Sequence, residues 1–145
     1  RYLLGKDCGK IRSADDLVQA LARFPEQFPP REVALMMWDL AREEPPQEDL
    51  LRRVAKEVVV PRADDFSAPQ LAEVACALAV GQAASGDAFR ALAEALVPRL
   101  DELPLDGEEG NLSGLLWSFT VAQASDPELY SALAQRAVTA LVEFQ

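Results

Sequence analysis

Few side chains in this chain of 145 residues could do chemistry, and none of them is a histidine. The chain therefore lacks the commonest general base, the commonest metal ligand and any Ser-His-Asp triad. Its two thiols, Cys8 and Cys76, have no metal-binding spacing and no histidine to activate them. We expect no catalytic residue, no metal site and no cofactor, so the sequence predicts a protein that is not an enzyme.

An acidic segment that begins at Asp101 comes nearest to a calcium loop. An EF-hand needs acids at positions 1, 3 and 5, glycine at position 6 and glutamate at position 12. Counted from Asp101, positions 3 and 12 are Leu103 and Leu112, so the pattern fails. A polar loop between helices is the better interpretation. Its acids are candidate contacts for a basic protein partner, and they are Asp101, Glu102, Asp106, Glu108 and Glu109.

The one basic cluster in the sequence comprises Arg52, Arg53, Lys56 and Arg62. On a helix, residues 52, 53 and 56 share one side, because side chains three and four positions apart are neighbours. A solvated helix face is the simpler interpretation of the cluster. The alternative is a contact with the phosphates of RNA or with another anion.

Charge is distributed unevenly along the chain. Acids and bases balance over residues 1–63, whereas residues 64–145 hold three basic and 13 acidic side chains and so carry the whole net charge of −10. This surface would repel a polyanion, because nucleic-acid affinity depends largely on neutralising phosphates. The second half is either a solvated acidic surface or a docking face for a basic partner.

The elements that position these side chains form a repeat. Residues 33–41, 71–79 and 112–120 align at offsets of 38 and 41, and a second set of apolar positions that begins at Leu51, Phe89 and Tyr130 has the same two offsets. Each set has the i, i+3, i+4, i+7 spacing of an amphipathic helix. A third marker, comprising Phe28, Phe66 and Leu105, precedes each first helix. The three extra residues of the last repeat are expected in the Gly-rich stretch 106–110.

Helix signals give seven expected helices, at about 14–24, 30–43, 47–59, 68–80, 86–101, 110–123 and 126–143. Gly81 is expected to end one helix, and Pro98 to kink or shorten another. Trp38 and Trp117 occupy the same place in the repeat, which favours packing in the core over stacking on a base.

A helix pair of this kind buries its apolar face against the next pair, so the pattern predicts an all-α, right-handed α-solenoid. The expected organisation is an N-terminal extension (1–12), a half repeat (13–28) and three repeats (29–66, 67–105 and 106–145). No apolar stretch approaches the ~20 residues needed to cross a bilayer. We also expect no signal peptide, because the chain reaches Asp7 before any hydrophobic region forms.

The first helices resemble the octotricopeptide repeats of algal organelles and the related helical repeats found with RAP domains and FAST kinases. Leu115-Leu116-Trp117 is the closest match, Met36-Met37-Trp38 also matches, and Cys76 departs from the pattern. The resemblance implies a nuclear-encoded protein imported into a plastid or mitochondrion, with RNA-binding activity that governs transcript stability, processing or translation. The acidic charge and short array favour instead a scaffold or adaptor subunit that docks onto a larger organellar protein complex. RNA binding is the alternative.

Overall fold

The computed structural model describes residues 13–105, 107, 110–124 and 126–144. In these segments the chain forms seven α-helices and no strand, which confirms the all-α prediction. The helices are α1 (Ala14–Arg23), α2 (Pro30–Ala41), α3 (Glu48–Val54), α4 (Ala68–Val80), α5 (Gly86–Leu96), α6 (Leu112–Val121) and α7 (Pro127–Phe144). The extension predicted for residues 1–12 lies outside the described residues. None of the helices described is both long and apolar enough to cross a membrane.

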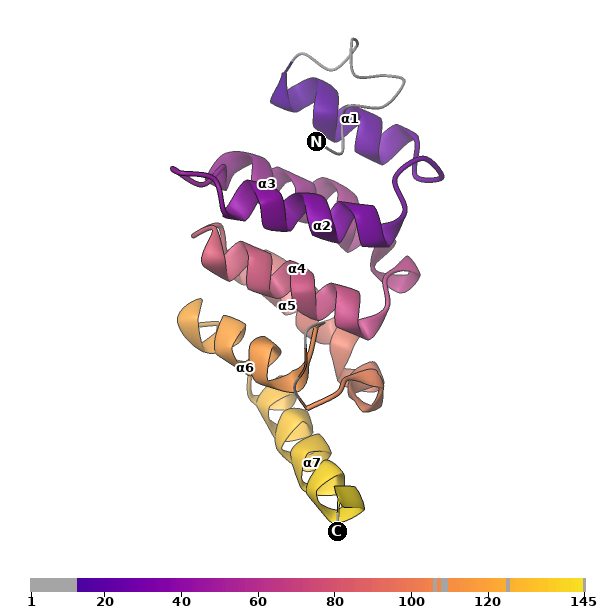
Figure 1. The fold of residues 1–145 in the computed structure, drawn as a ribbon, viewed down its shortest axis with the longest axis vertical. Coiled ribbons are helices and arrows are strands. Elements are labelled where there is room, and N and C mark those ends of the chain that lie inside the picture. Colours follow the sequence, from indigo (N-terminus) through magenta and orange to yellow (C-terminus); the bar gives the residue numbers. More distant parts are fainter. Residues whose placement is uncertain (1–12, 106, 108–109, 125, 145) are drawn as a thin grey trace.

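The helices lie in successive pairs along the long axis of the molecule (Figure 1). The first helices α2, α4 and α6 lie side by side in chain order, and α4 packs against both of the others. The second helices α3 and α5 lie behind α2 and α4, whereas α7 runs from α6 towards the end of the molecule (Figure 1). This order places the same face of three first helices next to one another.

Polar side chains fix where the helices begin. At α4, Ser67 Oγ accepts from the Gln70 backbone at 3.2 Å and Gln70 Oε1 accepts from the Ser67 backbone at 2.8 Å. This reciprocal pair forms the capping box that the sequence predicts. At α6, Asn111 Oδ1 accepts from the Gly114 backbone at 2.7 Å. Counted at the offset of 41, α6 therefore begins one turn later than α4, and a loop replaces that turn.

The ends of α4 and α6 are built alike. Gln82 and Gln123, 41 residues apart, both adopt a left-handed backbone conformation, with φ of 58° and 56°. The residue after each donates back across the helix end, Ala83 to Leu78 O at 2.8 Å and Ala124 to Phe119 O at 3.0 Å. Gly81 ends α4 as expected but with a negative φ of −81°. It is small for another reason, since a Cβ there would lie 2.4 Å from Leu51 Cδ1 and 3.2 Å from Ala41 Cα.

Each of the second helices α3 and α5 runs into a tighter turn at a Val-Pro-Arg sequence. A π-helical segment (Ala55–Val59) and a 3-10 helix (Val60–Asp65) follow α3, and a 3-10 helix (Val97–Glu102) follows α5. The predicted shortening at Pro98 is thus confirmed. The two Val-Pro-Arg sequences lie 37 residues apart, one fewer than the helices that precede them. The π-helical turn, which holds an additional residue, accounts for this difference.

A recurring arginine ties each second helix to the chain that precedes its first helix. Arg62 donates to Phe28 O at 3.1 Å, Arg99 to Phe66 O at 2.6 Å, and Arg136 to Leu103 O at 3.2 Å. These three arginines lie 37 residues apart in sequence. We call them the clamp arginines. They also correct the third marker, because the buried acceptor in the last repeat is Leu103, whereas Leu105 is only half-buried.

Candidate functional site

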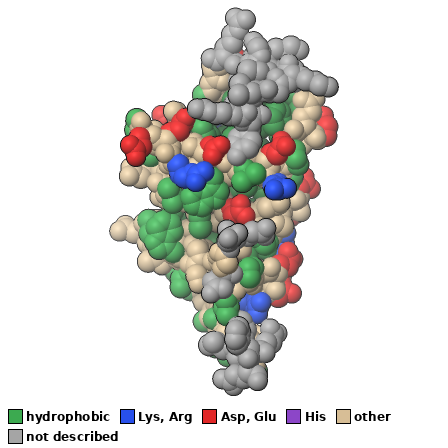
Figure 2. Space-filling model, in the orientation of Figure 1, with side chains coloured by type: hydrophobic (Ala, Val, Ile, Leu, Met, Phe, Trp, Pro, Cys, Tyr) green, Lys and Arg blue, Asp and Glu red, His purple; other side chains and the backbone are tan. Residues whose placement is uncertain are grey.

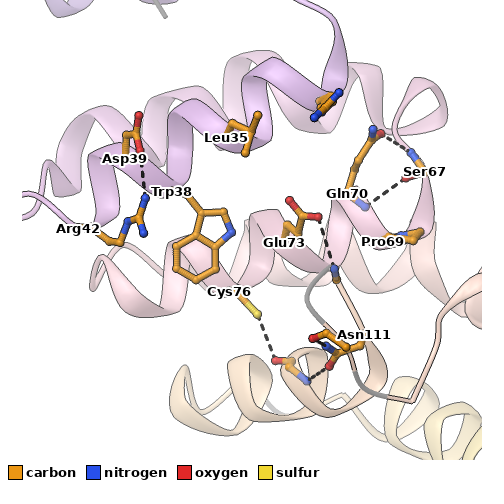
Figure 3. Close-up of a pocket in the computed structure, with 14 residues that line it drawn as sticks. Leu35, Trp38, Asp39, Arg42, Ser67, Pro69, Gln70, Glu73, Cys76 and Asn111 are labelled. Atoms are coloured by element: carbon orange, nitrogen blue, oxygen red, sulfur yellow. Dashed lines mark hydrogen bonds and ion pairs between the residues drawn. The ribbon is translucent and has the colours of Figure 1, made fainter. Parts of the chain in front are cut away.

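An open groove runs across the three first helices, with a volume of about 690 Å³ (Figure 3). We call it the first-helix groove. It is lined by α2 on one side, by α4 along the middle, and by α6 with the loop before it on the other side. Its lining residues are those of α2 (Arg31, Leu35, Trp38, Asp39, Arg42), those at the start and along α4 (Ser67, Pro69, Gln70, Glu73, Cys76), and Gly107, Gly110, Asn111 and Gly114.

Repeat spacing explains why these side chains share a face. Leu35 and Glu73 are separated by 38 residues, as are Trp38 and Cys76, so each pair occupies the same position in successive helices. Within one helix the lining positions are three, four and seven residues apart, which places them on one side. In the close-up, Leu35, Trp38 and Glu73 point into the space between α2 and α4 (Figure 3). A groove of this kind follows from the repeat itself.

The α2 wall of the groove combines apolar and charged side chains. Trp38 is half-buried and packs against the hydrophobic core, as the sequence predicts. Arg42 pairs with Asp39 one turn away, at 3.2 Å, and the exposed Arg31 lies nearer the start of the helix. The space-filling view of this side of the molecule shows hydrophobic side chains interspersed with acidic and basic ones (Figure 2). The wall can therefore contact apolar and polar groups of a ligand together.

The loop before α6 closes the groove over the first turn of α4. The Gly110 backbone donates to Glu73 Oε1 at 3.4 Å. A Cβ on Gly110 would lie 1.9 Å from Pro69 O, so only glycine allows this approach. The expectation that the additional residues of the last repeat lie in this loop agrees with the later start of α6.

Cys76 lies between α4 and α6. Its Sγ donates to Gly114 O at 3.4 Å and lies 2.9 Å from Ser118 Oγ, which also lies 2.7 Å from Gly114 O. Burial and the nearby carboxylate of Glu73 raise the pKa of the Cys76 thiol, while the contact with Ser118 opposes the shift. The thiol is therefore protonated at neutral pH, which makes it a poor nucleophile. Cys8 lies outside the described residues.

The predicted basic cluster is spread over several intramolecular contacts. Arg52 pairs with Asp49 and donates to Gln82 O, both at 3.2 Å. Arg53 pairs with Asp15 and Glu57, and the hydrogen bond from Asp15 is the largest cause of its raised pKa. Arg62 is a clamp arginine. Lys56 is exposed on the outer surface. The structure therefore uses three of the four side chains inside the fold, and none of the four lines the first-helix groove.

The predicted acidic contacts lie on another part of the surface. Asp101 and Glu102 are exposed in the 3-10 helix after α5, and Glu102 lies 3.6 Å from the clamp arginine Arg99. Neither lines the groove. Asp106, Glu108 and Glu109 lie outside the described residues. In the part of the chain that is described, no three potential metal-ligating side chains gather in one place.

Two features of the site were not anticipated from the sequence. The first is the groove, which the shared phase of Leu35, Glu73 and Asn111 could have indicated. The second is Trp117, whose predicted core packing is wrong, because its side chain is 48% exposed on α6. No described helix covers that side of α6.

Comparison with known proteins adds no relative. No family model matches the chain, and neither a curated protein nor a solved structure matches it.

Proposed function

We propose that this chain is a non-catalytic scaffold subunit, a right-handed α-solenoid that binds a polypeptide segment of its partner in the first-helix groove. The observation that carries the proposal is the groove itself, which takes equivalent positions from three successive first helices. Repeat proteins use extended surfaces of this kind for binding. The resemblance to octotricopeptide repeats supports an organellar assembly as the setting.

Two repeated features support the solenoid part of the proposal. The α2–α4 and α4–α6 pairs are formed in chain order by neighbouring first helices. The clamp arginines recur every 37 residues and make the same kind of contact to the preceding loop. Each repeat is thus held by its neighbours and by its own clamp, as expected for a stack of similar units.

The chemistry of the groove favours a polypeptide over a nucleic acid. Leu35 and Trp38 offer apolar surface, Arg31 offers a cation, and Glu73 offers a carboxylate. Protein interfaces combine apolar contacts with hydrogen bonds of both kinds. RNA binding would instead need a surface that neutralises several phosphates, and the net charge of −10 opposes this.

The test uses the full chain with an affinity tag, recovered from its native source under gentle conditions. We expect a stoichiometric protein partner that resists ribonuclease. The substitution Glu73→Lys in the groove should release this partner, whereas Glu94→Lys on the exposed surface of α5 should retain it. Both variants change the net charge equally, so the pair separates the groove from the overall charge.

Other results would contradict the proposal. If transcripts were recovered and were lost with ribonuclease or moderate salt, the chain would be an RNA-binding module. Recovery of the chain alone as a monomer would exclude a scaffold. Equal loss of the partner from both variants would place the partner elsewhere on the surface.

A further inference from the structure

One side of α6 exposes apolar side chains along the whole helix. Leu116, Trp117 and Val121 are 46%, 48% and 48% exposed. Ser113 and Thr120 on the same side are also exposed. We call these five residues the α6 outer face. The ten residues of α6 include no Asp, Glu, Lys or Arg, which is unusual for a helix that meets water along one side.

The equivalent face of α4 is covered by α6. The offset of 41 relates the α6 outer face to Ala72, Ala75, Cys76, Ala79 and Val80 of α4. Ala72 and Ala75 are 0% exposed and Ala79 is 8% exposed. Cys76 contacts Gly114 and Ser118 of α6 directly. This side of α4 therefore forms a helix–helix interface.

The equivalent face of α2 is covered in the same way by α4. The offset of 38 gives Ala34, Met37 and Ala41, which are 0%, 0% and 3% exposed. Ala41 Cα lies so near Gly81 of α4 that a Cβ there would approach to 3.2 Å. The α6 outer face thus continues an interface that the molecule already makes twice. Its natural occupant is another helix.

Charge selects the kind of helix. Residues 64–145, which include α4 to α7, hold three basic and 13 acidic side chains. Two copies of this chain that met at α6 would bring two such halves together, and like charges oppose that contact. A helix with basic side chains beside its apolar stripe would be attracted instead. Leu116 and Trp117 are also bulkier than their α4 equivalents Ala75 and Cys76, so small residues must face them if the helices are to approach closely.

We propose that the α6 outer face docks an amphipathic helix of another protein, with a Leu/Ala stripe flanked by Lys or Arg. The surface is separate from the first-helix groove and would bind even if the groove had no ligand. Trp117 provides the central contact, since exposed aromatic residues often dominate the binding energy of an interface.

The test measures binding of two fluorescein-labelled synthetic peptides by anisotropy at low salt. Both peptides are amphipathic helices of about 20 residues with the same Leu/Ala stripe. One has Lys and the other Glu at the flanking positions. We expect the full chain to bind the Lys peptide at least about tenfold more tightly than the Glu peptide, with a difference that shrinks as salt is added.

Matched variants locate the binding. Trp117→Gln should weaken binding of the Lys peptide by about tenfold or more. Phe24→Gln, which replaces an aromatic side chain with 43% exposure, should change it less than about twofold. Thr120→Arg provides a second variant on an exposed position of the same face, and it should also weaken binding. Circular dichroism checks that each variant is folded.

Three results would overturn the proposal. Equal binding of the Lys peptide by the unmodified chain and by Trp117→Gln would place the site elsewhere. Equal binding of the two peptides would remove the basic partner. Sedimentation of the chain as a dimer that Trp117→Gln dissociates would make a second copy the occupant. None of these results depends on whether Glu73→Lys releases a partner from the groove.

Discussion

The middle repeat and the last repeat present the same helix face in different surroundings. Ala75 of α4 and Leu116 of α6 occupy one repeat position, yet the first is 0% exposed and the second 46% exposed. The difference does not lie in local helix formation, because α4 and α6 end with the same left-handed glutamine. It comes from the neighbour, since α6 covers α4 and no described element covers the outer side of α6. Burial in a repeat protein is a property of the stack.

The largest effect should come from placing a charge at this shared position. Ala75→Arg would bury an unpaired guanidinium between α4 and α6, and should lower the free energy of unfolding by at least about 4 kcal/mol. Leu116→Arg would place the same group at an exposed position, with a change within about 1 kcal/mol. Urea denaturation followed by circular dichroism measures both. Similar losses at the two positions would mean that the faces have similar surroundings.

Removing a clamp arginine should have a smaller effect that is common to all repeats. Arg62→Ala, Arg99→Ala and Arg136→Ala would each leave a loop carbonyl without its charged donor, at a cost of about 1–3 kcal/mol. Arg90→Ala, at an exposed position of α5, should cost less than about 0.5 kcal/mol. Thermal or urea unfolding of the four variants makes the comparison. If Arg136→Ala were as mild as the control, the last repeat would lack a working clamp.

A methyl group at Gly81 should cost about 1–2 kcal/mol, because Leu51 and Ala41 must move apart to admit it. The last repeat has Ala122 at the equivalent position. Gly86→Ala is the matched control, since a Cβ there meets nothing within 4 Å and the change should be neutral or stabilising by about 0.4–1 kcal/mol. Urea denaturation of Gly81→Ala and Gly86→Ala should therefore shift the midpoint in opposite directions. A shift of the same sign would show that α2 and α4 are less closely packed at this point.

The smallest effect concerns the thiol between α4 and α6. With Cys8→Ser as background, alkylation of Cys76 by iodoacetamide should be slow at neutral pH, since its raised pKa keeps the thiol protonated. The rate should rise only above the pH at which an ordinary thiol ionises. Glu73→Gln removes one cause of the shift, so it should move the rate profile to lower pH. A profile that did not move would assign the shift to burial alone.

The stability contribution of this thiol has the opposite dependence on pH from that of a salt-bridged carboxylate. Because its pKa is raised in the folded chain, the unfolded chain releases the proton at a lower pH. The contribution is therefore complete below the pKa of the unfolded thiol. It is lost as pH rises through that value towards the folded one.

Much of the fold follows from periodicity. The seven helices and their order were predictable because each apolar stripe is long and regular, and the capping box at Ser67 marks its helix start directly. The clamp arginines were missed, although the repeated Val-Pro-Arg sequence at residues 60–62 and 97–99 was available. An arginine side chain reports its acceptor only through the fold, because the acceptor is a backbone carbonyl more than 30 residues away.

The candidate site was less predictable. Charge clusters in the sequence drew attention to Arg52, Arg53 and Arg62, yet these side chains contact their own chain. The groove residues come from three separate helices, and their mixture of types has no local pattern. Trp117 could not be placed from its helix alone, because the same helical pattern is buried or exposed according to what lies next to it.

The comparison between repeats can be tested most directly by labelling a single cysteine at one repeat position in two repeats. In a background of Cys8→Ser and Cys76→Ala, Ala79→Cys and Thr120→Cys occupy positions 41 residues apart, of which the first is 8% exposed and the second fully accessible on α6. A bulky maleimide should modify the purified Thr120→Cys chain nearly as fast as the unfolded chain. It should modify Ala79→Cys at least about a hundredfold more slowly, because reaction there requires α6 to detach. Equal rates at the two positions would contradict the inference that α6 covers α4 and leaves its own outer face open.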